Sequence, residues 1–146
     1  MSKDQKIVGG CLVGVAVSLL IVGVVSGTFI RHVIQILPIL VTVVGVAQRP
    51  TWGSYAAMPI FIFWALIVVL IWLYLLGISR IANGHYTIIE IVMTVFIALF
   101  SSAGVPICSR LGRSSAVPGR VVAFGVFGAL QFSAVWISFL KPFANR

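Results

Sequence analysis

The fold is decided by PTWGSYAAMPIFIFWALIVVLIWLYLLGIS, the thirty residues from Pro50 to Ser79, which contain no Asp, Glu, Lys, Arg or His. About 18 mainly apolar residues in a row already suffice to span a bilayer as a helix. The whole chain of 146 residues is 61% hydrophobic and has only two acidic residues, Asp4 and Glu90. So apolar a composition leaves too little polar surface for a water-soluble globule. The sequence therefore predicts an integral membrane protein.

Four further apolar runs predict an all-α bundle of five transmembrane helices that forms a single domain. The predicted spans are residues 7–26, 29–48, 56–79, 88–108 and 117–140. The second span is the weakest prediction, because Arg31, His32 and Gln35 stand near its start. If this segment were re-entrant or lay on the membrane surface, the bundle would have four spans.

The ten Lys and Arg residues lie in small groups at the ends of the apolar runs, as they do in the loops of membrane proteins. Five spans place six of them on the amino-terminal side (Lys3, Lys6, Arg49, Arg110, Arg113, Arg120) and four on the other (Arg31, Arg80, Lys141, Arg146). The excess predicts a cytoplasmic amino terminus, and we expect the cell membrane, of the bacterial cytoplasmic kind. A cleaved signal peptide is the alternative for the first run, although its twenty residues exceed the roughly 7 to 15 of a signal core.

Local motifs predict how the spans begin and end. Arg49 to Ser54 is predicted to be a loop, because a proline and a glycine interrupt it. Thr87-Ile-Ile-Glu90 has the form of a capping box, in which both side chains bond to backbone donors at a helix start. This gives the only acidic residue outside the amino tail a structural role. The aromatic residues along the third span are expected to face lipid: Phe61, Phe63, Trp64, Trp72 and Tyr74.

Small residues spaced four apart allow helices in a bilayer to approach closely. The predicted packing faces are Gly10, Gly14 and Ser18 in the first span and Gly125, Ala129 and Ser133 in the fifth, with Thr94, Ala98 and Ser102 similarly spaced in the fourth. We favour packing within the bundle as their role. Contact with a partner subunit is the alternative.

The five-span topology brings six polar residues to one membrane face, the outer one in the predicted orientation. They are Arg31, His32 and Gln35 at the start of the second span and Arg80, His85 and Glu90 around the start of the fourth. Ionisable groups at membrane depth are functional candidates by default, here for a proton, a quinone head or an anion. Alternatively, the arginines reach lipid phosphates, Glu90 caps its helix and the histidines lie in wet loops.

The sequence has no phosphate-binding loop, no pair of catalytic carboxylates and no cluster of metal ligands, so we expect no catalytic residue, metal or cofactor. We therefore expect a non-enzymatic accessory or scaffold subunit of a membrane complex. Its partners would be the lipid bilayer and other membrane subunits or further copies of the chain, and not nucleic acid. A small oligomeric transporter or channel is one alternative, and a membrane-embedded enzyme acting on lipid or quinone is another.

Overall fold

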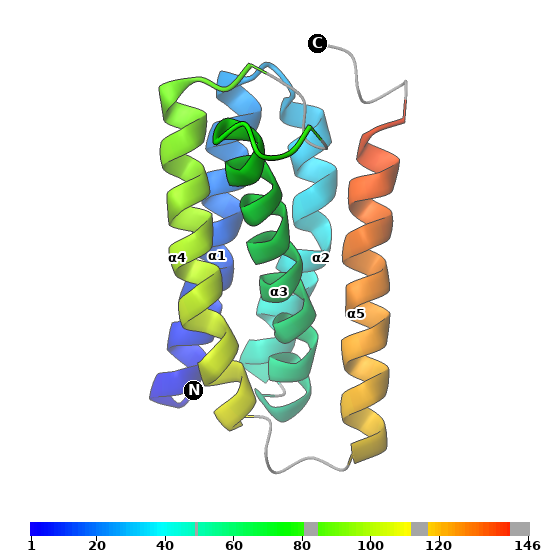
Figure 1. Cartoon of the computed structure of the whole chain (residues 1–146). Coiled ribbons are helices and arrows are strands. Elements are labelled where there is room, and N and C mark those ends of the chain that lie inside the picture. Colours follow the sequence, from blue (N-terminus) through cyan, green and yellow to red (C-terminus); the bar gives the residue numbers. More distant parts are fainter. Residues whose placement is uncertain (49, 81–84, 112–116, 141–146) are drawn as a thin grey trace.

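A computed structural model describes residues 1–48, 50–80, 85–111 and 117–140, and this part of the chain is almost entirely helical (Figure 1). The five helices are α1 (Lys3–Val25), α2 (Phe29–Gln48), α3 (Pro50–Leu75), α4 (Ile88–Leu111) and α5 (Val117–Ser138). Each is long and apolar enough to cross a membrane. Helices are suited to hydrocarbon because they satisfy their backbone hydrogen bonds internally. The predicted five-helix bundle is confirmed, and the chain is a multi-pass membrane protein.

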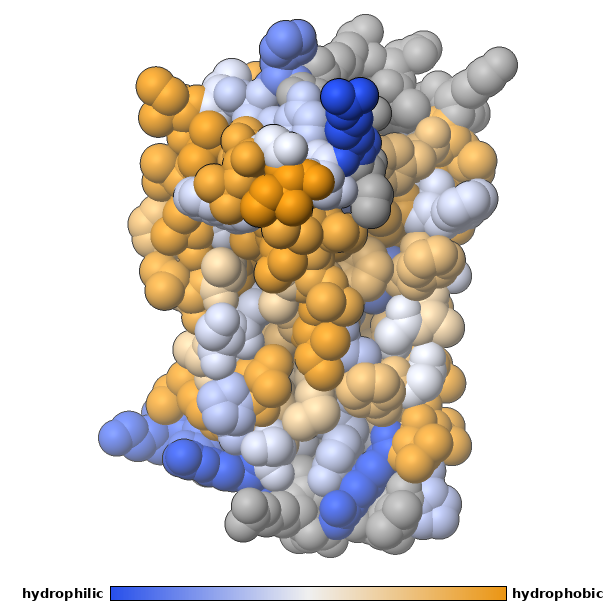
Figure 2. All heavy atoms as spheres, in the orientation of Figure 1, coloured by the Kyte–Doolittle hydropathy of each residue, from blue (hydrophilic) through white to orange (hydrophobic). Residues whose placement is uncertain are grey.

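The central helix of the bundle is α3. It lies in front of a row formed by α4, α1, α2 and α5, and it packs mainly against α4, α5 and α2 (Figure 1). Within the row, α1 packs against α4 and α2, and α2 packs against α5. Apolar residues cover most of the height of the bundle, and hydrophilic residues gather at its two ends (Figure 2). This distribution suits a body that crosses a bilayer.

The junction of α2 and α3 is a close helix crossing. The predicted loop is wrong in this region, because α3 already begins at Pro50, a residue type favoured at the first position of a helix. Arg49 lies outside the described residues. A Cβ atom on Gly53 would overlap the backbone of α2 at Gly45 and Val46. Glycine at this position therefore lets the two backbones meet.

The carboxyl end of α3 is set by Gly77, whose φ of 73° is in the left-handed region that favours glycine. Beyond it, the Ile78 N–H donates to the Leu73 carbonyl at 2.9 Å. This arrangement satisfies a carbonyl at the helix end that has no partner within the helix. Hydropathy predicts that the third span continues to Ser79. The helix ends at Leu75 instead, because the turn at Gly77 stops it.

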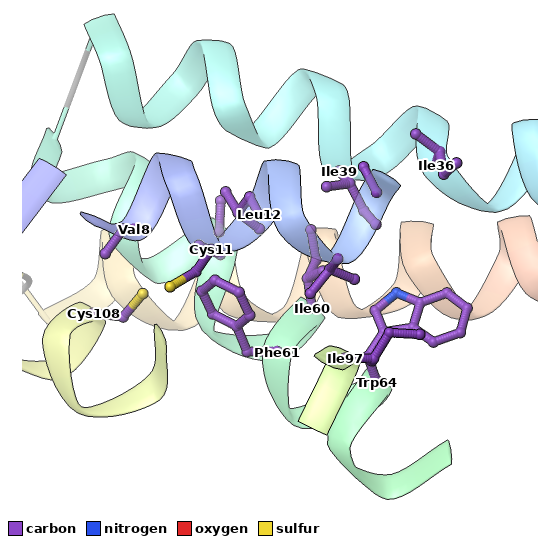
Figure 3. Packing of buried hydrophobic residues seen from close by; sticks show 14 of the residues in the cluster. Val8, Cys11, Leu12, Ile36, Ile39, Ile60, Phe61, Trp64, Ile97 and Cys108 are labelled. Carbon is purple, nitrogen blue, oxygen red and sulfur yellow. The ribbon is translucent and has the colours of Figure 1, made fainter. Parts of the chain in front are cut away.

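Two of the aromatic residues expected to face lipid belong to the core instead. Phe61 is fully buried and Trp64 is 5% exposed. A Cβ on Gly104 of α4 would overlap the Phe61 ring, so that glycine makes room for it. Figure 3 shows Phe61 near Cys11 and Trp64 near Ile97. Because α3 has neighbours on several sides, its aromatic residues point to helices as well as to lipid.

The small-residue face predicted on α1 is used in part. Gly14 faces the ring of Phe100 on α4, and Ser18 is buried and donates to the Gly14 carbonyl at 2.8 Å. Gly10 is exposed, and a Cβ on it would have no neighbour within 4 Å. Gly14 and Ser18 of the predicted face therefore lie within the packed bundle, and Gly10 does not.

The packing face predicted on α5 is wrong for the bundle. Gly125, Ala129 and Ser133 are all exposed, and a Cβ on Gly125 would meet nothing within 4 Å. The helix instead buries Phe127 and Gln131. Gln131 is a polar side chain that needs hydrogen-bond partners, and turning it inward turns the small residues outward.

Two glycine substitutions test the close crossing. Gly53→Ala should lower the melting temperature in detergent, because overpacking a tight contact costs about 1–3 kcal/mol. Gly125→Ala, also within a helix but in open space, should leave stability unchanged or raise it by up to about 1 kcal/mol. Thermal unfolding followed by circular dichroism measures both. Equal melting temperatures for the two variants would contradict the crossing.

Candidate functional site

A partly enclosed cavity of about 510 Å³ lies at the end of the bundle where α1, α3 and α5 end and α2 and α4 begin. All five helices contribute to its wall. Its apolar lining consists of Leu19, Val22, Trp64, Ile67, Val68, Leu70, Ile71, Ile97, Val135 and Phe139. Its polar lining consists of Ser26, Thr28, Arg31, His32, Gln35, His85, Tyr86, Glu90 and Thr94. The cavity is therefore amphipathic.

The predicted polar cluster is largely gathered around this cavity. Five of the six residues belong to the wall, and they come from two parts of the chain that are fifty residues apart: Arg31, His32, Gln35, His85 and Glu90. Arg80 does not belong to it and is exposed. Because α3 already ends at Leu75, Arg80 lies past the turn that follows the helix.

Glu90 and Thr87 form the predicted capping box at the start of α4. The Thr87 N–H donates to Glu90 Oε2 at 2.6 Å, and the Glu90 N–H donates to Thr87 Oγ1 at 3.3 Å. The Glu90 side chain is 6% exposed. A carboxylate has two acceptor oxygens, and the cap uses one. The other oxygen, Oε1, takes no part in the cap.

His32 is held by the turn between α1 and α2. Its Nδ1 lies 3.0 Å from the Thr28 carbonyl oxygen and 3.1 Å from the Thr28 hydroxyl. A carbonyl only accepts, so Nδ1 carries the proton in the neutral ring and Nε2 is an acceptor. A Cβ on Gly23 would lie 2.9 Å from the His32 Cβ, so this glycine lets the histidine approach α1.

Gln35 is the buried polar residue that connects α2 to α5. Its Nε2 donates to Ser138 Oγ at 2.8 Å, and its backbone carbonyl accepts from Gln131 Nε2 at 3.2 Å. All three residues are less than 5% exposed. These bonds fix the rotation of α5. Sequence reasoning missed Gln131 and Ser138, although a single glutamine in an apolar span was a usable signal.

The charged groups of the wall have opposite signs. The guanidinium carbon of Arg31 lies 3.5 Å from the centre of the Phe139 ring, a cation–π contact. The carboxylate of Glu90 is the only acidic group among the described residues of the lining. Among the described lining residues, the formal charges of Arg31 and Glu90 cancel.

Two tryptophans of α3 lie at or beside the cavity wall near α4. The Trp72 indole donates to Thr94 Oγ1 at 3.0 Å, which places a hydrogen bond between two helices beside the cavity. Trp64 lines the apolar part, and its buried indole nitrogen has no hydrogen-bond partner in the part of the chain that the structure describes. The sequence analysis expected both tryptophans to face lipid and so did not predict that they lie at or beside the cavity.

Comparisons with known proteins give no direct guide to function. The chain matches no protein-family model, no curated protein and no solved structure. Among the described residues, no group of three or more His, Cys, Asp or Glu side chains could hold a metal ion. The functional argument therefore rests on the chemistry of the cavity.

Substitutions of Glu90 test the capping box. Glu90→Ala should lower the free energy of unfolding by about 1 kcal/mol, the usual contribution of a cap. Glu90→Gln keeps an acceptor for the Thr87 N–H and should retain nearly all of the stability. Denaturation in mixed micelles, followed by circular dichroism, compares them. A Glu90→Gln protein as unstable as Glu90→Ala would show that the cap depends on charge and not on an acceptor.

Proposed function

We propose that this protein binds a small amphipathic molecule of the membrane in the cavity at the polar end of the bundle. The observation that supports the proposal is the lining, in which apolar side chains of the spans continue into polar side chains of the helix ends. A lipid-soluble molecule with a polar head has the same division. The function would be binding, delivery or sensing of that molecule, without chemistry of the protein's own.

The size and position of the cavity support the same proposal. Small-molecule sites typically have volumes of about 300 to 1,000 Å³ and lie between packed elements with a few polar groups that orient the ligand. The cavity has about 510 Å³, and its walls come from all five helices. Ionisable residues inside a membrane are costly, and their concentration at one cavity favours a functional reason.

A paired substitution at the cavity tests the proposal. The protein is purified from its membrane in mild detergent, and the small molecules that come with it are identified by mass spectrometry of an organic extract. We expect an amphipathic molecule in roughly stoichiometric amount. Ile97→Phe, at a buried lining position, should remove it, whereas Leu99→Phe, on the same helix and 60% exposed, should retain it. Equal retention by two folded variants would contradict the proposal.

The second candidate function is that of an accessory or scaffold subunit. The observation that favours it is the outward stripe of Gly125, Ala129 and Ser133 on α5, flanked by the exposed aromatic residues Phe132 and Trp136. Small residues at this spacing permit close packing of a helix from another chain. The two candidates are compatible, because the stripe and the cavity are separate features.

Substitution within the stripe tests the second candidate. Ala129→Leu should break an association seen after mild solubilisation, because the larger side chain holds the neighbouring helix away. Val126→Leu, exposed on the same helix but off the stripe, should preserve it. Size-exclusion chromatography with light scattering measures the assembly. If both variants assemble like the unsubstituted protein, α5 is not the contact.

A further inference from the structure

We infer that the cavity takes a neutral, hydroxyl-bearing amphiphile, such as a lipid alcohol, a phenol or a quinol, whose hydroxyl donates its one hydrogen to the Glu90 carboxylate, beside the further acceptors of His32 and Gln35. This inference rests on the proposed binding function and adds the chemical class of the ligand. It follows from the hydrogen bonds that these residues already make. Each bond fixes which atom of the side chain remains to meet a ligand.

The orientation of the Gln35 amide is set by Ser138. The single hydroxyl hydrogen of Ser138 is donated to the Val135 carbonyl at 2.6 Å. Towards Gln35 its oxygen can therefore only accept, so the group that faces it, 2.8 Å away, is the amide NH₂. The side-chain amide oxygen of Gln35, Oε1, is then left as an acceptor.

His32 and Glu90 also keep an acceptor atom after their structural hydrogen bonds are made. His32 uses Nδ1–H on the Thr28 carbonyl, which makes Nε2 an acceptor in the neutral ring. Glu90 uses one oxygen to cap α4 and keeps the other. Three acceptor atoms therefore belong to one cavity wall. A ligand that only accepts would match none of them, and a buried unmatched polar group is costly. One hydroxyl hydrogen matches one of them, and the charged carboxylate of Glu90 is the strongest acceptor of the three.

The charges of the wall argue against an ion as the ligand. An anion would meet the Glu90 carboxylate together with the acceptors of His32 and Gln35. A cation would meet the guanidinium of Arg31, which lies in the same wall over the Phe139 ring. Because the two formal charges cancel, an uncharged hydroxyl is the head group that suits the wall best. It donates and also accepts, and the wall contains an indole N–H, that of Trp64, without a hydrogen-bond partner among the described residues. The apolar lining suits the chain or ring attached to the hydroxyl.

Three probes with the same alkyl chain test the ligand class: 4-nonylphenol donates, 4-nonylanisole only accepts, and 4-nonylbenzoate is an anion. Binding to the chain of 146 residues, after removal of endogenous lipid, is measured by native mass spectrometry from detergent micelles. We expect the phenol to bind at least about tenfold more tightly than the ether or the benzoate. Glu90→Gln turns one acceptor into a donor and should reduce the preference for phenol over ether to below about threefold.

The outcomes separate this inference from the proposed function. Binding of the ether or the benzoate as tightly as the phenol, lost in Ile97→Phe and kept in Leu99→Phe, would overturn the ligand class and leave the binding function intact. Binding of none of the probes, with no molecule in the extract of the purified protein, would overturn both. A preference for phenol that Glu90→Gln leaves unchanged would also overturn the inference, because the acceptor set would not be its cause.

Discussion

A polar side chain inside a bilayer has no water to bond to, and this constraint determines how the helices of the bundle are turned. Gln5 of α1 donates to the Val46 carbonyl of α2 at 3.1 Å. Gln35 of α2 donates to Ser138, the last residue of α5, and Gln131 of α5 donates to the backbone of α2. These buried bonds link α1 to α2 and α2 to α5. Apolar packing alone specifies such rotations poorly, because lipid is as apolar as the side chains.

The same constraint explains why the cavity lies at one end of the bundle. The start of α2 and the start of α4 come together there, and each contributes polar side chains that first satisfy the local backbone. His32 bonds to the turn before α2, and Glu90 caps α4. Neither residue exhausts its bonding capacity in doing so. A structural role and a binding role can therefore belong to the same residue, and a helix cap does not exclude contact with a ligand.

The sequence predicted the features that depend on local chemistry. Hydropathy was sufficient to predict five helices, and the spacing of Thr87 and Glu90 was sufficient to predict the helix cap. The predicted topology also placed five of the six cluster residues at one cavity. Successive spans cross the membrane in opposite directions, so the second and fourth helices begin at the same membrane face. The sequence could not predict how each helix is rotated, since rotation depends on partners distant in sequence. Gln131 of α5 faces inward, where its amide donates to the backbone carbonyl of Gln35. The small-residue face of α5, expected to pack within the bundle, therefore points outward.

The central claim is that the cavity is occupied by an amphipathic molecule when the protein is in a membrane. The most direct measurement labels the methyl groups of Ile97, Val68 and Val135 in protein purified from its membrane into deuterated detergent, and records their nuclear Overhauser contacts. All three residues line the cavity. The account predicts cross-peaks to aliphatic protons of a bound molecule that the protein carried from the membrane. Cross-peaks to water alone, or to no protons other than those of the protein, would contradict it.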